Sequence, residues 1–109
     1  MIGARTARVL LVTAPNEETA RSIARVLVGE RLAACVSVIP VSASIYHWEG
    51  KIAEEPECLL LVKTTVARVE SLARRIVALH PYSVPEILSL PVEKGLAAYI
   101  AWLSEATRE

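Results

Sequence analysis

Two apolar runs constrain this chain more than any other feature of its sequence. Val9 to Val12 and Cys58 to Val62 are each the length of a strand and carry apolar side chains at every position. Successive residues of a strand point to opposite faces of a sheet, so a strand with one wet face alternates apolar and polar residues. These two runs do not alternate. Both faces of their strands therefore need to be buried.

The remaining pattern predicts one α+β domain in the order strand, helix, strand, strand, helix, strand, and then a terminal helix. The expected strands are Ala7–Thr13, Ala33–His47, Lys51–Thr64 and Glu86–Leu90, and the last helix is striped by Leu96, Tyr99, Ile100 and Leu103. This order is the ferredoxin-like βαββαβ plan, in which helices cover one face of an antiparallel sheet. The other face must be covered by another copy of the chain, so the sequence predicts self-assembly.

Local signals place the ends of the two internal helices. Asn16 is expected to cap the first helix, with Glu17 and Glu18 in its first turn, and Gly29 to end it. Thr65 is expected to cap the second helix. The inner face of that second helix is predicted to comprise Val69, Leu72, Ala73, Ile76 and Val77.

The two middle strands meet around Trp48-Glu49-Gly50-Lys51, which is a hairpin signal. Pro40 and Pro56 interrupt them, and prolines are confined to sheet edges, strand starts or bulges. The outer half of the hairpin should therefore bend or project beyond the sheet. A turn at Glu49 and Gly50 leaves Cys35 and Cys58 several positions out of register, which predicts free thiols.

Length and charge narrow the class of protein. The 109 residues suit a single domain, 1–109, with residues 1–6 as a flexible N-terminal extension. The formal net charge of zero argues against a nucleic-acid partner, and the apolar runs are too short to span a membrane. No export signal is evident and reduced cysteines are expected, so we predict a cytoplasmic location.

The connector His80-Pro81-Tyr82-Ser83-Val84-Pro85-Glu86 joins the second helix to the last strand and is stiffened by its two prolines. Each proline restricts the residue before it, so few backbone states are left to lose on ordering. His80 has two interpretations, which the residues leave open. It either completes the end of the helix, where an imidazolium is favoured, or ligates a metal ion.

Other candidate residues also carry two interpretations each. The Cys35 thiolate suits a soft ion such as copper, whereas a buried cysteine behaves as a small hydrophobe. Lys63 interrupts an apolar strand, and its ammonium needs a partner such as Glu86 at a subunit boundary. An interface ion pair and an anion-binding cleft are equally compatible with that pattern. Tyr46 and Trp48 are expected to anchor an interface.

Taken together, these segments resemble the CutA family of divalent-cation tolerance proteins. The matching segments are Thr13-Ala14-Pro15, Arg31 to Cys35, Ser44-Ile45-Tyr46, Trp48 to Lys51, Lys63-Thr64-Thr65, His80-Pro81-Tyr82, Val84-Pro85-Glu86 and Tyr99 to Leu103. The resemblance implies a homotrimer built like the PII signalling trimers, with sheets inward, helices outward and hairpins reaching across to neighbours. Val12 and Leu79 stand where some copper-binding bacterial relatives carry a cysteine and a second histidine.

The resemblance implies a non-enzymatic homotrimer that acts in copper tolerance. It needs no cofactor and binds copper(II), or another divalent cation, weakly through His80 and Cys35. The alternative is a signalling or scaffold trimer that binds a small anionic effector or an unidentified protein partner at intersubunit clefts around Lys63, Tyr82 and Glu86. An enzyme is disfavoured, because the turn Thr13 to Asn16 lacks the glycine-rich, arginine-bearing phosphate loop with which acylphosphatases of the same topology open.

Overall fold

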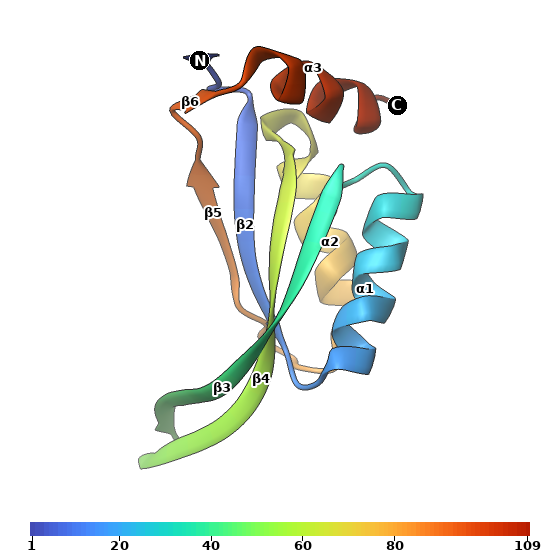
Figure 1. Ribbon diagram of the computed structural model, residues 1–109. Helices are drawn as coiled ribbons and strands as arrows, with labels where there is room; N and C mark the ends of the chain where they lie inside the picture. Colours follow the sequence, from blue (N-terminus) through green and yellow to red (C-terminus); the bar gives the residue numbers. More distant parts are fainter.

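The computed structural model describes residues 1–109 as a twisted sheet with helices against one face (Figure 1). The elements are β1 Ile2–Gly3, β2 Ala7–Ala14, α1 Glu17–Gly29, β3 Cys35–Trp48, β4 Lys51–Thr65, a short 3₁₀ helix η1 Val66–Arg68, α2 Val69–Leu79, β5 Ile87–Pro91, β6 Lys94–Gly95 and α3 Ala97–Ala106. The predicted α+β class and order of the main elements are confirmed.

The main sheet has the strand order β3-β4-β2-β5, and every neighbouring pair is antiparallel. The two strands with continuous apolar runs, β2 and β4, are therefore the central ones. Helices α1 and α2 lie against one face of the sheet, and α3 lies across its end, near both chain termini (Figure 1). None of the helices is long and apolar enough to cross a membrane.

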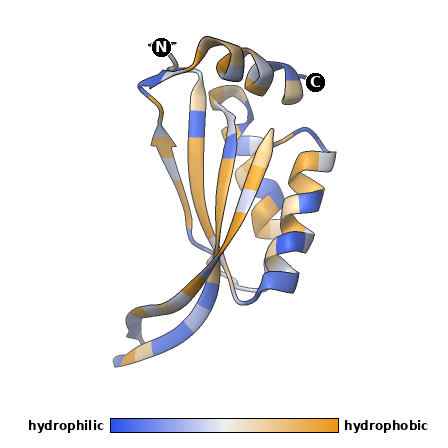
Figure 2. Cartoon of the chain, viewed as in Figure 1, coloured by the Kyte–Doolittle hydropathy of each residue, from blue (hydrophilic) through white to orange (hydrophobic).

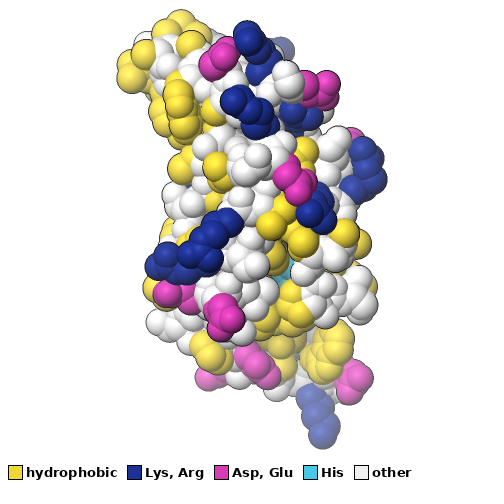
Figure 3. All heavy atoms as spheres, turned by 90° about the vertical axis from the view of Figure 1, so that its right-hand side faces the viewer, with side chains coloured by type: hydrophobic (Ala, Val, Ile, Leu, Met, Phe, Trp, Pro, Cys, Tyr) yellow, Lys and Arg dark blue, Asp and Glu magenta, His cyan; other side chains and the backbone are white.

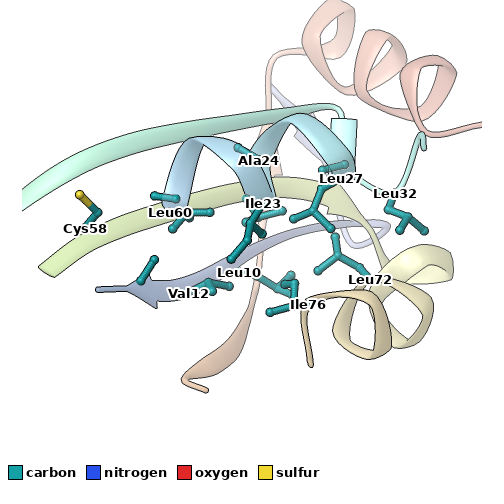
Figure 4. Packing of buried hydrophobic residues seen from close by; sticks show 14 residues of the cluster. Leu10, Val12, Ile23, Ala24, Leu27, Leu32, Cys58, Leu60, Leu72 and Ile76 are labelled. Carbon is teal, nitrogen blue, oxygen red and sulfur yellow. The ribbon is translucent and has the colours of Figure 1, made fainter. Parts of the chain in front are cut away.

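The hydrophobic core lies between the sheet and the helices α1 and α2 (Figure 4). Alternate residues of the central strands point into it, and Leu10, Val12, Leu60 and Val62 have no exposed surface. The helices contribute Ile23, Leu27, Leu72 and Ile76. Cys58 lies at the edge of the same cluster, so it packs as a small hydrophobe.

The helix ends follow the sequence signals only in part. Asn16 caps α1, since the Thr19 N–H donates to Asn16 Oδ1 at 2.8 Å. Gly29 is the last residue of α1, but Arg31 takes the left-handed conformation after it, with φ 59°. Thr65 makes no side-chain capping bond; instead, the next residue's N–H donates to the Thr6 carbonyl at 2.7 Å. Val77 is 54% exposed and does not belong to the inner face of α2.

Residues 1–6 form part of the folded structure. Strand β1 pairs with β6 through Ile2 with Gly95 and Gly3 with Lys94, and Ala4 is buried. The expectation of a flexible extension is corrected here. A two-residue strand is too short to show any periodicity, so the sequence carried no signal for it.

Strands β3 and β4 form a long hairpin whose outer half, here called the arm, extends beyond the sheet (Figure 1). The turn has Glu49 at φ 49° and Gly50 at φ 76°, which is the type I′ geometry that matches strand twist. The register shifts between Val41 and Ser44, so that two residues of β3 face the single residue Pro56 of β4. This is a β-bulge, and it lies opposite a proline that has no N–H to donate.

Candidate functional site

The face of the sheet turned away from α1 and α2 is mostly apolar, and these helices leave it uncovered; we call it the open face. By strand pairing it comprises Cys35, Ser37 and Ile39 of β3, Leu59, Leu61 and Lys63 of β4, Val9, Leu11 and Thr13 of β2, and Leu88 and Leu90 of β5. Leu88 is 54% and Leu90 45% exposed. Figure 2 shows the hydrophobic colour running along the central strands, whereas the arm of β4 is mainly hydrophilic.

Lys63 is the charged residue on the open face, and the groups that its side chain contacts are neutral. Its Nζ donates to Ser37 Oγ at 2.6 Å and lies 3.8 Å from Cys35 Sγ. Neither partner is a carboxylate, and Lys63 belongs to none of the four ion pairs. Tyr99 of α3 also lies near this group: burial raises the pKa of its phenol, and Cys35 adds a smaller contribution in the same direction. A partly buried ammonium with neutral neighbours is poorly compensated.

His80 ends α2 and uses both ring nitrogens inside the chain. Nε2 lies 2.7 Å from the Thr13 carbonyl oxygen, and Nδ1 accepts the Tyr82 N–H at 3.1 Å. A carbonyl can only accept and a backbone N–H can only donate, so the ring is neutral with its proton on Nε2. His80 is 8% exposed. These two bonds tie the end of α2 to the end of β2. A neutral ring bonded in this way is not the imidazolium expected at the helix end, and metal ligation by His80 stays a prediction.

Tyr82 reaches from the same connector to the base of the arm. Its hydroxyl donates to Glu57 Oε2 at 3.2 Å, and its ring lies 4.9 Å from the His80 ring. Burial raises the pKa of the Tyr82 phenol, and the negative charge of Glu57 beside it raises it further. Glu57 lies two residues before Leu59 and four before Leu61 on β4, so its side chain points to the same, open side of the sheet. The connector thus wraps around the end of the sheet.

The two predicted metal ligands do not meet within one chain. Cys35 stands in the same cross-strand row as Val9, whereas His80 contacts Thr13. Four residues along a strand span about 13 Å, far beyond any shared coordination sphere. No three His, Cys or Glu side chains gather anywhere in the chain to hold a metal ion. The donor set of a single chain therefore does not fit a closed copper site.

Lys63 and Glu86 are likewise apart. Glu86 precedes β5 at the end of the sheet where Val12 pairs with Ile87, and it is exposed. Lys63 pairs with Val9 near the other end of β2. An ion pair between the two residues would need two copies of the chain.

The predicted interface anchors lie on the arm, away from the core. Tyr46 is 41% and Trp48 63% exposed, and the apolar residues Ile45 and Ile52 beside them are 66% and 73% exposed. Exposed aromatic and aliphatic side chains on a projecting hairpin are typical of a surface that another chain covers.

Three residues of this region were not singled out from the sequence. Ser37 lies two positions after Cys35 on the same face of β3; register counted from the turn would have placed it opposite Val62, and the bulge moves its partner to Leu61. Glu57 could have been placed on the open side by the same alternation. The nearness of Tyr99 to Cys35 had no local signal, because it depends on how α3 crosses the sheet.

Comparison with known proteins decides the family. The sequence model of the family described as CutA1 divalent ion tolerance protein matches residues 8–106 of this chain. The chain belongs to the CutA1 family. A relative from Thermus thermophilus named divalent-cation tolerance protein CutA is 54% identical over 99 residues, which is 91% of this chain and 96% of the relative. A CutA from Escherichia coli is 43% identical over 103 residues, 94% of this chain and 92% of the relative.

Solved CutA1 structures have the same fold. The Thermus thermophilus protein superposes with a TM-score of 0.90 at 52% identity, covering 94% of this chain and 99% of that one. CutA from Synechococcus elongatus gives a TM-score of 0.95 at 37% identity, covering 98% and 95%. The family resemblance drawn from the sequence segments is therefore confirmed.

Proposed function

We propose that this CutA1-family chain is a non-enzymatic homotrimer that acts in divalent-cation tolerance. The observation that carries the proposal is the open face: the central strands have apolar side chains on both sides, and α1 and α2 cover only one of them. A face of this kind, flanked by an arm with exposed aromatic residues, suits burial against further copies. Relatives named for divalent-cation tolerance support the physiological role.

Native mass spectrometry at low micromolar concentration tests the assembly. Obligate interfaces commonly bury more than about 2,000 Å², so three 11.9 kDa chains should remain together down to this concentration. A dominant folded single chain would contradict the trimer.

Cation binding by the protein is proposed to be weak. His80 must give up bonds to Thr13 and Tyr82 before its ring can ligate, and Cys35 is too distant to share an ion with it in one chain. Copper(II) binds such N and S donors more tightly than other divalent first-row ions. We therefore expect copper affinities of about micromolar or looser. The role in tolerance would then rest on a response to the ion rather than on its tight storage.

Calorimetric titration with copper(II) tests this point. We expect His80→Ala to weaken the isotherm, and His47→Ala serves as the matched control at the exposed arm. Binding should weaken at acid pH, because a protonated imidazole cannot ligate. An isotherm unchanged in His80→Ala would make His80 purely structural. Nanomolar binding would contradict the weak site.

A second candidate function follows from Lys63. Its ammonium has only neutral contacts on the open face, so an assembled trimer could offer it to a small anion or to a carboxylate such as Glu86 of another copy. This favours an effector-binding or scaffold role, with Tyr82 and Glu86 near the same clefts. Titration of the protein and of its Lys63→Met variant with small carboxylates and nucleotides separates this role from cation tolerance.

For the cellular compartment, we propose the cytoplasm, because both cysteines are free thiols.

A further inference from the structure

We propose that Cys35 and Lys63 form a redox modification site, at which hydrogen peroxide drives a covalent bond between the Cys35 sulfur and the Lys63 amine nitrogen. The inference is independent of copper binding. It rests on the arrangement of these two side chains within one chain and on the absence of a competing thiol nearby.

The two side chains are held in the right relation by the sheet. Cys35 and Lys63 are direct partners in the antiparallel pair β3–β4, so both point to the open face with Cβ atoms about 5 Å apart. Lys63 Nζ lies 3.8 Å from Cys35 Sγ, and its bond to Ser37 Oγ at 2.6 Å keeps it there. The lysine stem is flexible enough to close the remaining distance without moving either strand.

The second cysteine cannot compete for oxidised Cys35. Cys58 is paired with Pro40, five positions along β3 from Cys35, and its side chain points to the core. Five residues of strand span about 16 Å, whereas the Cα atoms of a disulfide lie within about 7 Å. Cys35 is a free thiol that keeps part of its surface exposed. The side-chain nitrogen that contacts its sulfur is that of Lys63, at 3.8 Å.

The reaction balances with one equivalent of hydrogen peroxide. The Cys35 thiolate attacks peroxide; an S–O bond forms, the O–O bond breaks, and the products are a sulfenic acid and one water. The lone pair of the neutral Lys63 amine then attacks sulfur. The S–N bond forms, the S–O bond breaks, and the departing hydroxide takes the amine proton to give a second water. Sulfur is oxidised by two electrons and peroxide is reduced, while two equivalents of an external thiol reverse the step.

The bond would change the open face in two ways. A nitrogen bound to sulfur in this form is not basic, so the ammonium of Lys63 would disappear from an otherwise apolar surface. The bond would also tie β3 to β4 at the inner end of the hairpin. Both changes bear on any partner that meets this face.

Intact-protein mass spectrometry after peroxide treatment at mildly alkaline pH tests the inference on the assembled protein. We expect a loss of about 2 Da per chain, which dithiothreitol restores, and a linked peptide pair containing Cys35 and Lys63. Cys35→Ser and Lys63→Arg should abolish the loss, and the matched control Cys58→Ala should keep it. Peptide mapping of the unmutated protein decides the question even if a variant fails to fold.

Several results would overturn the inference. A gain of about 16 Da alone would mean a sulfenic acid that Lys63 does not capture, and a gain of about 14 Da would mean that an oxygen stays between the two atoms. A disulfide between chains would assign Cys35 a different partner. A loss of 2 Da that persists in Lys63→Arg, or no change of mass at all, would also contradict it.

Discussion

The two faces of the main sheet are made by the same strands but meet different surroundings. On the helix side, Leu10, Val12, Leu60 and Val62 are fully buried by α1 and α2. On the open side, the residues that alternate with these, such as Leu11 and Leu61, are only partly buried. A continuous apolar run in a central strand thus specifies two contact surfaces at once. One is completed by the chain itself, and we propose that further copies of the chain complete the other.

Polar residues on the two faces show the same contrast. Thr64 points to the helix side, has no exposed surface, and donates to the Leu32 carbonyl at 2.6 Å. Its neighbour Lys63 points to the open side and finds only neutral groups. The outward surface of the helices differs again, because Figure 3 shows basic and acidic side chains intermingled across it. The chain therefore completes its own hydrogen bonds on the helix side and leaves a charge uncompensated on the open side.

The largest effect is expected from the helix face. Leu60→Ala removes a fully buried side chain from a core that cannot collapse around the gap, which should lower the free energy of unfolding by about 2–5 kcal/mol. Urea denaturation followed by circular dichroism measures this. A cost below about 1 kcal/mol would mean that the helix face is less tightly packed than its burial indicates.

A substitution one residue away should act on assembly instead. Leu61→Gln places an amide of similar length on the open face, where water can hydrate it in a single chain but a partner would leave it unpaired. We expect a folded protein whose mass by light scattering falls from three chains towards one. Val28→Gln, on the exposed surface of α1, is the control and should not change the mass. An intact trimer in Leu61→Gln would break the contrast between the faces.

His80 connects the helix side to the end of the sheet, and its removal should have an intermediate effect. His80→Ala leaves the Thr13 carbonyl and the Tyr82 N–H without their partner, at a cost of about 1–3 kcal/mol. Hydrogen exchange should show faster exchange of the Tyr82 amide. His80→Gln, which can still donate and accept, should recover part of the loss. Unchanged exchange at Tyr82 would argue against this role.

The smallest effect concerns pH. Burial and the Glu57 carboxylate raise the pKa of Tyr82 above its usual value of 10.0, so the protonated phenol is the form that folding favours. Its contribution to stability is fully present below that usual value and disappears as pH rises through the raised pKa. Absorbance titration should therefore show two late-titrating phenols, Tyr82 and Tyr99, and only one in Tyr82→Phe. A Tyr82→Phe curve with the same late fraction would refute the assignment.

Sequence reasoning succeeded where local chemistry decides the structure. The lack of alternation marked the apolar runs of β2 and β4 as strands with two apolar faces, Asn16 was recognised as a cap from its side chain, and Trp48 to Lys51 was recognised as a hairpin turn. It failed where distant segments decide. Thr65 lost its capping role because the next N–H finds a carbonyl of residue 6, and β1 exists only because β6 lies beside it.

The candidate site was predictable to a similar degree. Lys63 was recognised as unusual because a charge interrupted an apolar strand, and the structure places it beside Cys35, which the sequence had singled out for another reason. His80 was recognised as constrained, but its two partners are backbone groups of Thr13 and Tyr82. Backbone carbonyls and amides are the same in every residue, so no side-chain pattern could have revealed that the ring was already engaged.

The bulge between Val41 and Ser44 has a consequence for which side chains the arm presents. Before it, odd-numbered residues of β3 share a side with Leu61; after it, the even-numbered Tyr46 and Trp48 do, because they pair with Ala53 and Lys51. Deletion of Ser42 or Ala43 would leave these pairs in place, because each half of the hairpin keeps its own register, but it would remove the bend and the extra twist that a bulge gives its strand. Here one extra residue in β3, rather than any side chain, influences the direction in which the arm presents its exposed aromatic rings.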